Sequence, residues 1–175
     1  MKEKAFIGIY IKNFKPWKGL LSLTEEVRNT EVSGVFVISR WDGKIGFPGG
    51  YIEEGETAIE GALRELEEET SIIVEPEELE LISADNGVYF YGVEKTIEEV
   101  IRYQKEMCES IDYGTEIIGS TILYLGDYKD SFKSFMSYPF VKEAKVQLIE
   151  LIKQKELKND FKNEKVKEKW SFHEH

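Results

Sequence analysis

The sequence predicts an α/β fold built as a sandwich around one sheet. Its 175 residues are 41% hydrophobic and 13% aromatic, which is enough to bury a single core without disulfides or a structural metal. Segments typical of strands and helices follow each other in mixed order rather than in regular strand–helix pairs. We therefore expect an α/β sandwich and not a doubly wound sheet.

Four segments are rich in β-branched and aromatic residues and are predicted to be strands. They are residues 5–11, 32–39, 87–94 and 117–125. Residues 43–50 hold four glycines and Pro48, which predicts a loop.

Three segments have apolar residues at helical spacing and are predicted to be helices. Ile59, Ala62, Leu63 and Leu66 define the first, which Thr57 caps and Pro76 confines to residues 57–70. A second helix is marked by residues 97–107. A third follows Pro139, where Val141, Ala144, Leu148 and Leu151 share one face.

Composition narrows the class of function. The formal net charge of -11, from 34 acidic and 23 basic residues, repels polyanions and argues against a non-specific nucleic-acid binder. An acidic site still reaches phosphates through divalent cations, because the metals reverse the local potential. Cys108 is the only cysteine, and nowhere do 18 apolar residues stand in a row, so we expect a cytoplasmic protein without a membrane segment.

The helix predicted at residues 57–70 carries an acidic face. Glu65, Glu68 and Glu69 stand at i, i+3 and i+4, so their carboxylates project from one side and repel each other. Divalent cations with oxygen ligands relieve such repulsion. A solvated surface is the commoner explanation of a glutamate-rich helix. The glycine loop before the helix and Arg64 within it favour a metal site instead.

Arg64 and Glu56 are predicted to support these carboxylates. Arg64 stands four residues before Glu68, where a guanidinium orients a carboxylate through paired hydrogen bonds. Glu56 lies at the boundary of loop and helix, where it caps the helix or braces the glycine loop.

The segment from Gly50 to Ile72 resembles the Nudix box. Matching positions are held by Gly50, Glu56, Arg64, Glu65, Leu66, Glu68, Glu69 and Ile72. Ser71 departs from the pattern, because a glycine is expected there to ease a left-handed helix end. This departure changes the helix cap and leaves the acidic residues intact.

The resemblance implies a Nudix α/β/α sandwich with a mixed sheet. It also implies hydrolysis of a nucleoside diphosphate linked to another group, supported by two or three Mg²⁺ or Mn²⁺ ions. Glu65, Glu68 and Glu69 would be metal ligands, with the Gly49 carbonyl completing the set. Glu68, Glu65 and Arg64 would be the catalytic residues, with Arg64 orienting Glu68.

Flanking segments are similar to the snoRNA-decapping and inosine-diphosphatase branch of that family. They are residues 40–50, Gly61, residues 114–119 and residues 140–150. From this branch we carry over Arg40, Phe47 and Gln147 as substrate contacts, with Gln147 on the base. Glu116, Glu150 and Asp85 are carried over as accessory acidic residues at the metals. The branch also implies a homodimer.

Each of these flanking residues has a simpler alternative. Arg40 would pair with a surface carboxylate, Phe47 would belong to the core, and Gln147 would be an ordinary helix residue. Glu116, Glu150 and Asp85 would be solvated. The branch places a histidine against the purine, but the matching position here, near Ile7, is apolar. The sequence therefore does not predict a preference for inosine.

Three functions stay open at this point. The first is a pyrophosphatase for a small nucleotide such as (d)IDP, NADH or ADP-ribose. The second is an RNA-decapping enzyme, for which the lysine-rich residues 153–175 are the only basic track that the sequence offers. The third is a nucleotide sensor without catalysis. We expect residues 1–152 to form the Nudix domain, with 153–175 as a lysine-rich helix end and tail.

Overall fold

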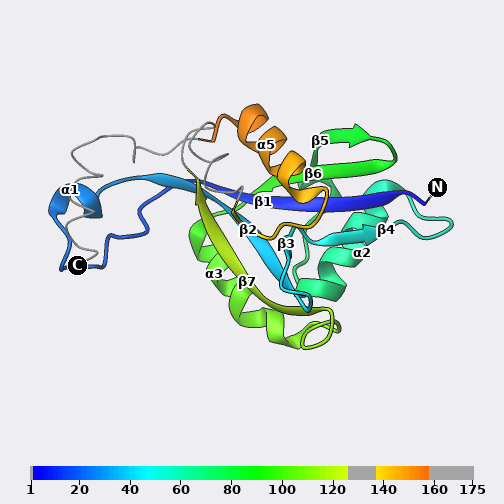
Figure 1. Cartoon of the computed structure of the whole chain (residues 1–175), viewed down its shortest axis with the longest axis horizontal. Helices are drawn as coiled ribbons and strands as arrows, with labels where there is room; N and C mark the ends of the chain where they lie inside the picture. The colour runs from blue at the N-terminus through cyan, green and yellow to red at the C-terminus, as the bar shows by residue number, and fades with distance from the viewer. Residues whose placement is uncertain (1, 126–136, 158–175) are drawn as a thin grey trace.

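The computed structural model describes residues 2–125 and 137–157, and these build one mixed sheet (Figure 1). Its central path runs in the order β3-β2-β1-β6-β5, with β4 also paired to β1 and β7 to β2. The strands are β1 (Lys4–Phe14), β2 (Val32–Arg40), β3 (Ile45–Gly46), β4 (Gly49–Tyr51), β5 (Glu80–Asp85), β6 (Val88–Glu94) and β7 (Ile117–Leu125). Only the β1–β6 pair is parallel among these strands.

Helices cover both faces of this sheet. On one face lie α2 (Ala58–Thr70) and α3 (Ile97–Glu106), and on the other lies α5 (Ala144–Lys155) (Figure 1). The short elements are α1 (Glu25–Arg28), η1 (Pro76–Glu78) and η2 (Met107–Glu109).

Strand β1 explains how one sheet supports two cores. Successive side chains of a strand point to opposite faces. Ile7 and Ile9 therefore pack in the core beneath α2 and α3, whereas Phe6 and Tyr10 pack in the core beneath α5. Because both faces are buried, the strand reads as a continuous apolar run. The predicted α/β/α sandwich with a mixed sheet is confirmed.

The predicted strands and helices are all present, but the glycine-rich segment was predicted wrongly. Residues 43–50 contain β3 and the start of β4 rather than only a loop. Gly49 and Gly50 pair with Phe6 and Ala5 through their backbones, so no side-chain pattern marks the strand. Edge strand β5 was also missed, because its sequence ELISAD mixes polar and apolar residues without clear alternation.

The C-terminal helix α5 extends into the start of the lysine-rich segment. It ends at Lys155, whose Nζ pairs with Glu80, and Leu157 is buried in the core beneath α5. The packed part of the chain therefore includes residues 153–157. The rest of the lysine-rich segment, with His173 and His175, lies outside the described residues.

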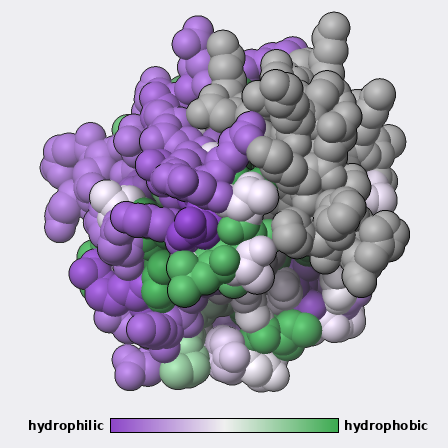
Figure 2. Space-filling view, turned by 90° about the vertical axis from the view of Figure 1, so that its left-hand side faces the viewer, coloured by the Kyte–Doolittle hydropathy of each residue, from purple (hydrophilic) through white to green (hydrophobic). Residues whose placement is uncertain are grey.

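The end of the molecule that holds α1 has some exposed apolar side chains. Figure 2 views this end and shows hydrophobic groups near the middle of a face that is otherwise largely hydrophilic. Leu20 and Leu21, in the connection between β1 and α1, are exposed. Within the described residues, no helix is both long enough and apolar enough to cross a bilayer.

Candidate active site

The start of α2 is fixed by a reciprocal cap. The Thr57 hydroxyl accepts from the Glu60 backbone N–H, and the Glu60 carboxylate accepts from the Thr57 N–H. This cap sets the helical register, and Ala62 and Leu66 are fully buried against the sheet. The opposite side of the helix then carries Arg64 and Glu68 toward the surface.

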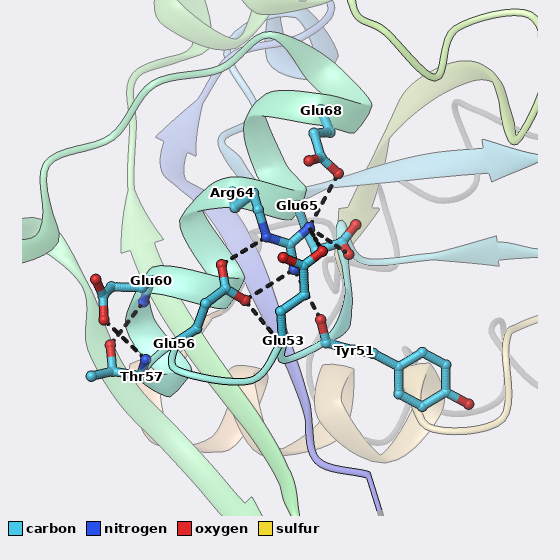
Figure 3. A network of polar contacts seen from close by, with 8 residues as sticks. All are labelled: Tyr51, Glu53, Glu56, Thr57, Glu60, Arg64, Glu65 and Glu68. Atoms are coloured by element: carbon cyan, nitrogen blue, oxygen red, sulfur yellow. Dashed lines mark hydrogen bonds and ion pairs between the residues drawn. The ribbon is translucent and has the colours of Figure 1, made fainter.

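Arg64 is the centre of a network of carboxylates (Figure 3). Its Nε and Nη2 donate to the two oxygens of Glu56 at 2.7 and 3.1 Å, which is a bidentate pair. Its Nη1 donates at 3.2 Å to both Glu65 and Glu68. Its Nη2 also donates to the Tyr51 carbonyl at 3.0 Å. Arg64 thus ties the helix to β4 and to the loop before α2.

Glu56 has the supporting position that the sequence predicts. Beside its two bonds from Arg64, its Oε1 accepts from the Glu53 N–H at 2.8 Å. The hydrogen bonds from Arg64 hold the pKa of Glu56 below its usual value. Glu56 therefore stays ionised, and it braces the loop against the helix.

Strand β4 needs glycines because the backbone lies so close to its neighbours. A Cβ on Gly49 would stand 2.3 Å from the Ala5 carbonyl oxygen, and one on Gly50 would stand 2.8 Å from the Glu65 carboxylate. Gly50 therefore leaves the space that the Glu65 carboxylate fills. The Gly49 N–H donates to Glu69 at 2.7 Å, so the strand also anchors the most buried acid of the site.

Glu69 is a buried carboxylate that faces other acids. Its side chain is 6% exposed, and burial raises the pKa of Glu69 to about 9, although the Gly49 hydrogen bond lowers it. The charges of Glu65, Asp112 and Glu116 also raise it. Burial likewise raises the pKa of Glu65 and that of Asp112. Four acids from α2 and the segment before β7 therefore stand close enough to repel each other.

These residues fit a hard divalent cation. The donors are all oxygens, and burial and the neighbouring acids raise the pKa values of Glu69, Glu65 and Asp112, so a cation bound among them would favour their ionised forms. Within residues 2–125 and 137–157, no three acidic, histidine or cysteine side chains already converge as metal ligands do. Arg64 Nη1 instead holds Glu65 and Glu68 together.

Asp112 was not foreseen from the sequence. It lies in the turn between η2 and β7, and its backbone N–H donates to the Glu68 carbonyl at 3.1 Å. The Ser110 hydroxyl donates to the Glu69 carbonyl at 2.9 Å in the same turn. The end of α2 therefore holds this turn in place, which brings Asp112 and Glu116 to the acidic group.

A cavity of about 670 Å³ opens on the other side of β4. It lies between the sheet and α5, and its lining includes Tyr51, whose carbonyl is bound by Arg64. Gln147 of α5 also lines it; this side chain is 5% exposed, and its Nε2 has no hydrogen-bond partner in the structure. A buried donor without a partner is costly, so this atom stands out from the other buried polar groups.

The other predicted substrate contacts lie elsewhere. Phe47 is buried beneath α5 with its ring 4.9 Å from that of Phe90, which favours the alternative that it belongs to the core. Arg40 donates to Asp42 at 3.0 Å, as the surface-pair alternative expects. The neighbouring Trp41 N–H donates to the Glu116 carbonyl, so Arg40 nevertheless lies beside the acidic group.

The accessory acids divide into two sets. Glu116 belongs with the α2 carboxylates, since its charge acts on Glu69 and Asp112. Asp85 lines the cavity instead, and Glu150 lies on α5, across the sheet from α2. The structure does not bring Asp85 and Glu150 together with the α2 acids, so their positions give no support to a role at the metal. Ile7, near the position where the family resemblance places a histidine, is fully buried in the core.

Comparison with known proteins identifies the family. Residues 28–158 match the model of the Nudt16-like family, described as U8 snoRNA-decapping enzyme-like. The chain belongs to this family. The match includes β3, β4, α2 and all of α5, so it confirms the resemblance to the decapping branch of the Nudix superfamily.

Two curated relatives are similar over part of their length. A U8 snoRNA-decapping enzyme of Xenopus laevis is 30% identical over 129 residues, covering 66% of this Nudt16-like chain and 61% of the relative. That of Homalodisca vitripennis is 27% identical over 115 residues, covering 61% and 62%. The chain thus spans less than two thirds of either relative.

A solved structure confirms the fold. The MutT/nudix family protein from Enterococcus faecalis matches 87% of this chain and 61% of its own, with a TM-score of 0.56 at 14% identity. Similarity at this level of identity shows the architecture alone.

Proposed function

We propose that the protein is a Mg²⁺- or Mn²⁺-dependent hydrolase that cleaves the pyrophosphate linkage of a nucleotide. The observation that carries the proposal is the acidic group at α2, in which Arg64 Nη1 lies 3.2 Å from both Glu65 and Glu68, the Gly49 N–H holds the buried Glu69 at 2.7 Å, and burial raises the pKa of Glu69 and that of Glu65. Family membership supports the same chemistry.

Each residue of this group then has a defined task. Glu65, Glu68 and Glu69 would hold two or three cations, with the Gly49 carbonyl as a further ligand and Asp112 and Glu116 beside them. Bound there, the cations would neutralise the charge that develops on the phosphates. Arg64 keeps Glu68 in position through the 3.2 Å contact, and the Glu56 pair fixes Arg64 in turn.

The nucleoside would enter the cavity between the sheet and α5. Gln147 Nε2 supports this placement, because it offers a buried hydrogen-bond donor that an oxygen of a base or ribose would satisfy. Arg40, on the side of the acidic group away from this cavity, would hold a phosphate. Phe47 would contribute to the wall beneath the site rather than stack on the base.

Decapping of RNA is the second candidate function. The curated relatives are named U8 snoRNA-decapping enzymes, which supports a capped RNA as substrate, and RNA would then be the partner. The expected homodimer and cytoplasmic location stay predictions. A sensor without catalysis is the least favoured candidate, because the complete set of box acids is retained.

The test is a panel assay with Mg²⁺ or Mn²⁺ over IDP, dIDP, GDP, NADH, ADP-ribose and capped RNA, with analysis of the products. Glu68→Gln is expected to reduce turnover on the best substrate by on the order of a hundredfold, as loss of a transition-state stabiliser does. Glu67→Gln is the matched control, since Glu67 is an exposed neighbour on the same helix.

Selective cleavage of one class of substrate would support the hydrolase and choose between the first two candidates. Nucleotide binding without any cleavage would favour the sensor. Turnover of Glu68→Gln equal to that of Glu67→Gln would show that Glu68 has no part in the chemistry.

A further inference from the structure

We propose that the cavity beneath α5 binds a phosphate group of the substrate that is not part of the cleaved linkage. Lys4 and Lys142 would hold this group, with Lys2 at the rim. The proposal rests on the proposed function and narrows its substrate class to nucleotides that carry an additional phosphate.

The first support is the charge of the cavity. The whole chain has a net charge of -11, yet this cavity is lined by Lys2, Lys4 and Lys142 against Asp85 and Glu143. Glu143 forms an ion pair with Lys4: the Lys4 Nζ lies 3.2 Å from the Glu143 Oε1. In the described part of the chain, neither Lys2 nor Lys142 forms an ion pair with an acidic side chain. The lining of the cavity therefore carries more positive than negative charge, whereas the chain as a whole is acidic.

The second support is the buried amide of Gln147. Gln147 lines the same cavity, the residue is 5% exposed, and its buried Nε2 lacks a hydrogen-bond partner. This unpartnered amide and the lysine ammonium groups are all donors. A ligand that satisfies them must be rich in acceptors, and a phosphorylated nucleoside is such a ligand.

The third support is the position of the cavity relative to the acidic group. Tyr51 separates them: its carbonyl accepts from Arg64, while its ring lies 5.2 Å from Lys4 Nζ and 5.4 Å from Lys2 Nζ. An anion held by the lysines would therefore lie across β4 from the phosphates at the α2 acids. The two phosphate groups would be different parts of one substrate.

Two kinds of substrate offer this chemistry. One is a small dinucleotide with a phosphate on its ribose, and the other is a capped RNA, whose first nucleotide carries a 3′-phosphate. Both present a phosphate separated from the pyrophosphate by a ribose. The test therefore uses pairs of compounds that differ by that phosphate alone.

The experiment measures kcat/KM with Mg²⁺ for NADPH against NADH, and for a capped dinucleotide with and without a 3′-phosphate. We expect the phosphorylated member to be favoured by about tenfold, since a hydrogen bond to a charged group is worth about 1.5–3 kcal/mol and a tenfold ratio needs about 1.4. Lys4→Met and Lys142→Met should remove this preference. Lys105→Met, on α3 across the sheet, should keep it.

The two pairs of compounds distinguish the two sources of the phosphate. A preference in the NADPH pair alone identifies a small dinucleotide as the source of the phosphate, and one in the capped pair alone identifies RNA; either supports the site. Equal kcat/KM within both pairs overturns the inference but leaves the hydrolase intact.

A binding measurement separates the two proposals if nothing is cleaved. Calorimetry compares adenosine 2′,5′-bisphosphate with AMP. Tighter binding of the bisphosphate that depends on Lys142 would support the phosphate site while the hydrolase fails. Equal binding of the two compounds would overturn the site.

Discussion

The two sides of β4 differ in the sign of their charge. On one side the α2 acids surround a single arginine, and burial raises the pKa values of Glu65 and Glu69. On the other side three lysines line a cavity that also holds the unpartnered Gln147 amide. Tyr51 belongs to both, through its carbonyl on one side and its ring on the other.

This difference shows what each side lacks. Cations would neutralise the carboxylates of the acidic side, and an anion with several acceptors would bind the donors of the cavity. A phosphorylated nucleotide with divalent cations supplies both needs at once, because the cations reverse the sign of the acidic side. If both sites bind as proposed, the chain acts on a polyanion although it is acidic overall, because the attraction is confined to one site.

The largest effect is expected from Arg64→Lys, which tests the acidic side. Lysine keeps the charge but loses the planar fork that binds Glu56 at two points while it holds Glu68. We expect kcat to fall by on the order of a hundredfold, as displacement of a catalytic group by about 1 Å does. Steady-state kinetics with saturating Mg²⁺ measures it.

Arg102→Lys is the control for this variant, because Arg102 is exposed on α3 and its nearest acid, Glu106, is 4.0 Å away. If Arg64→Lys and Arg102→Lys both retain the kcat of the unaltered protein, the Arg64 network only supports the fold.

The metal-free protein should lose stability as pH rises. Because burial raises the folded-state pKa of Glu69 from 4.5 to about 9, the folded protein keeps a proton that the unfolded chain releases. Its stabilising contribution is complete below about pH 4.5 and is lost by about pH 9. Melting temperatures in EDTA at increasing pH measure this, and Glu69→Gln should flatten the decline.

Cations should oppose the same decline. They favour the ionised acids, so Mg²⁺ at about a hundred times its dissociation constant should stabilise the protein by about 2.7 kcal/mol at alkaline pH. Equal melting temperatures in Mg²⁺ and EDTA at that pH would argue against a metal site on α2.

Tyr51→Leu should separate the two sides. Arg64 binds the Tyr51 backbone, which this substitution keeps, whereas the lysines lose the ring. An exposed cation–π contact is worth about 0.5–1 kcal/mol, so we expect KM to rise by about threefold while kcat stays the same. Tyr51→Phe retains the ring and should retain KM. A fall in kcat for Tyr51→Leu would mean that its ring also supports the acidic side.

Much of the fold was predictable because local signals agree. Thr57, the apolar stripe and Pro76 together define α2, and the structure places the cap where the sequence does. Strands β4 and β5 were not predictable. The first is held by the backbones of glycines, and the second is a half-exposed edge strand, so neither leaves a regular pattern of side chains.

The candidate site was predictable where it lies on one helix. Glu65, Glu68 and Glu69 share a face by helical spacing alone, but Asp112 joins them through a turn that no spacing along the chain predicts. Gln147, which the family resemblance predicts as a substrate contact, also has a local signal: it stands beside Leu148 and one turn after Ala144, on the buried stripe of α5. A polar residue in that stripe points inward.

The smallest effect is expected from Ser71→Gly, which alters the end of α2 without touching an acid or a lysine. Ser71 has φ 63° and ψ 8°, a left-handed conformation that costs a residue with a Cβ about 1 kcal/mol. Glycine should recover about that amount in chemical denaturation, with kcat unchanged. Ser71→Ala, which keeps the Cβ, should gain nothing. If glycine destabilises the protein, the serine hydroxyl contributes more to this cap than its backbone strain removes.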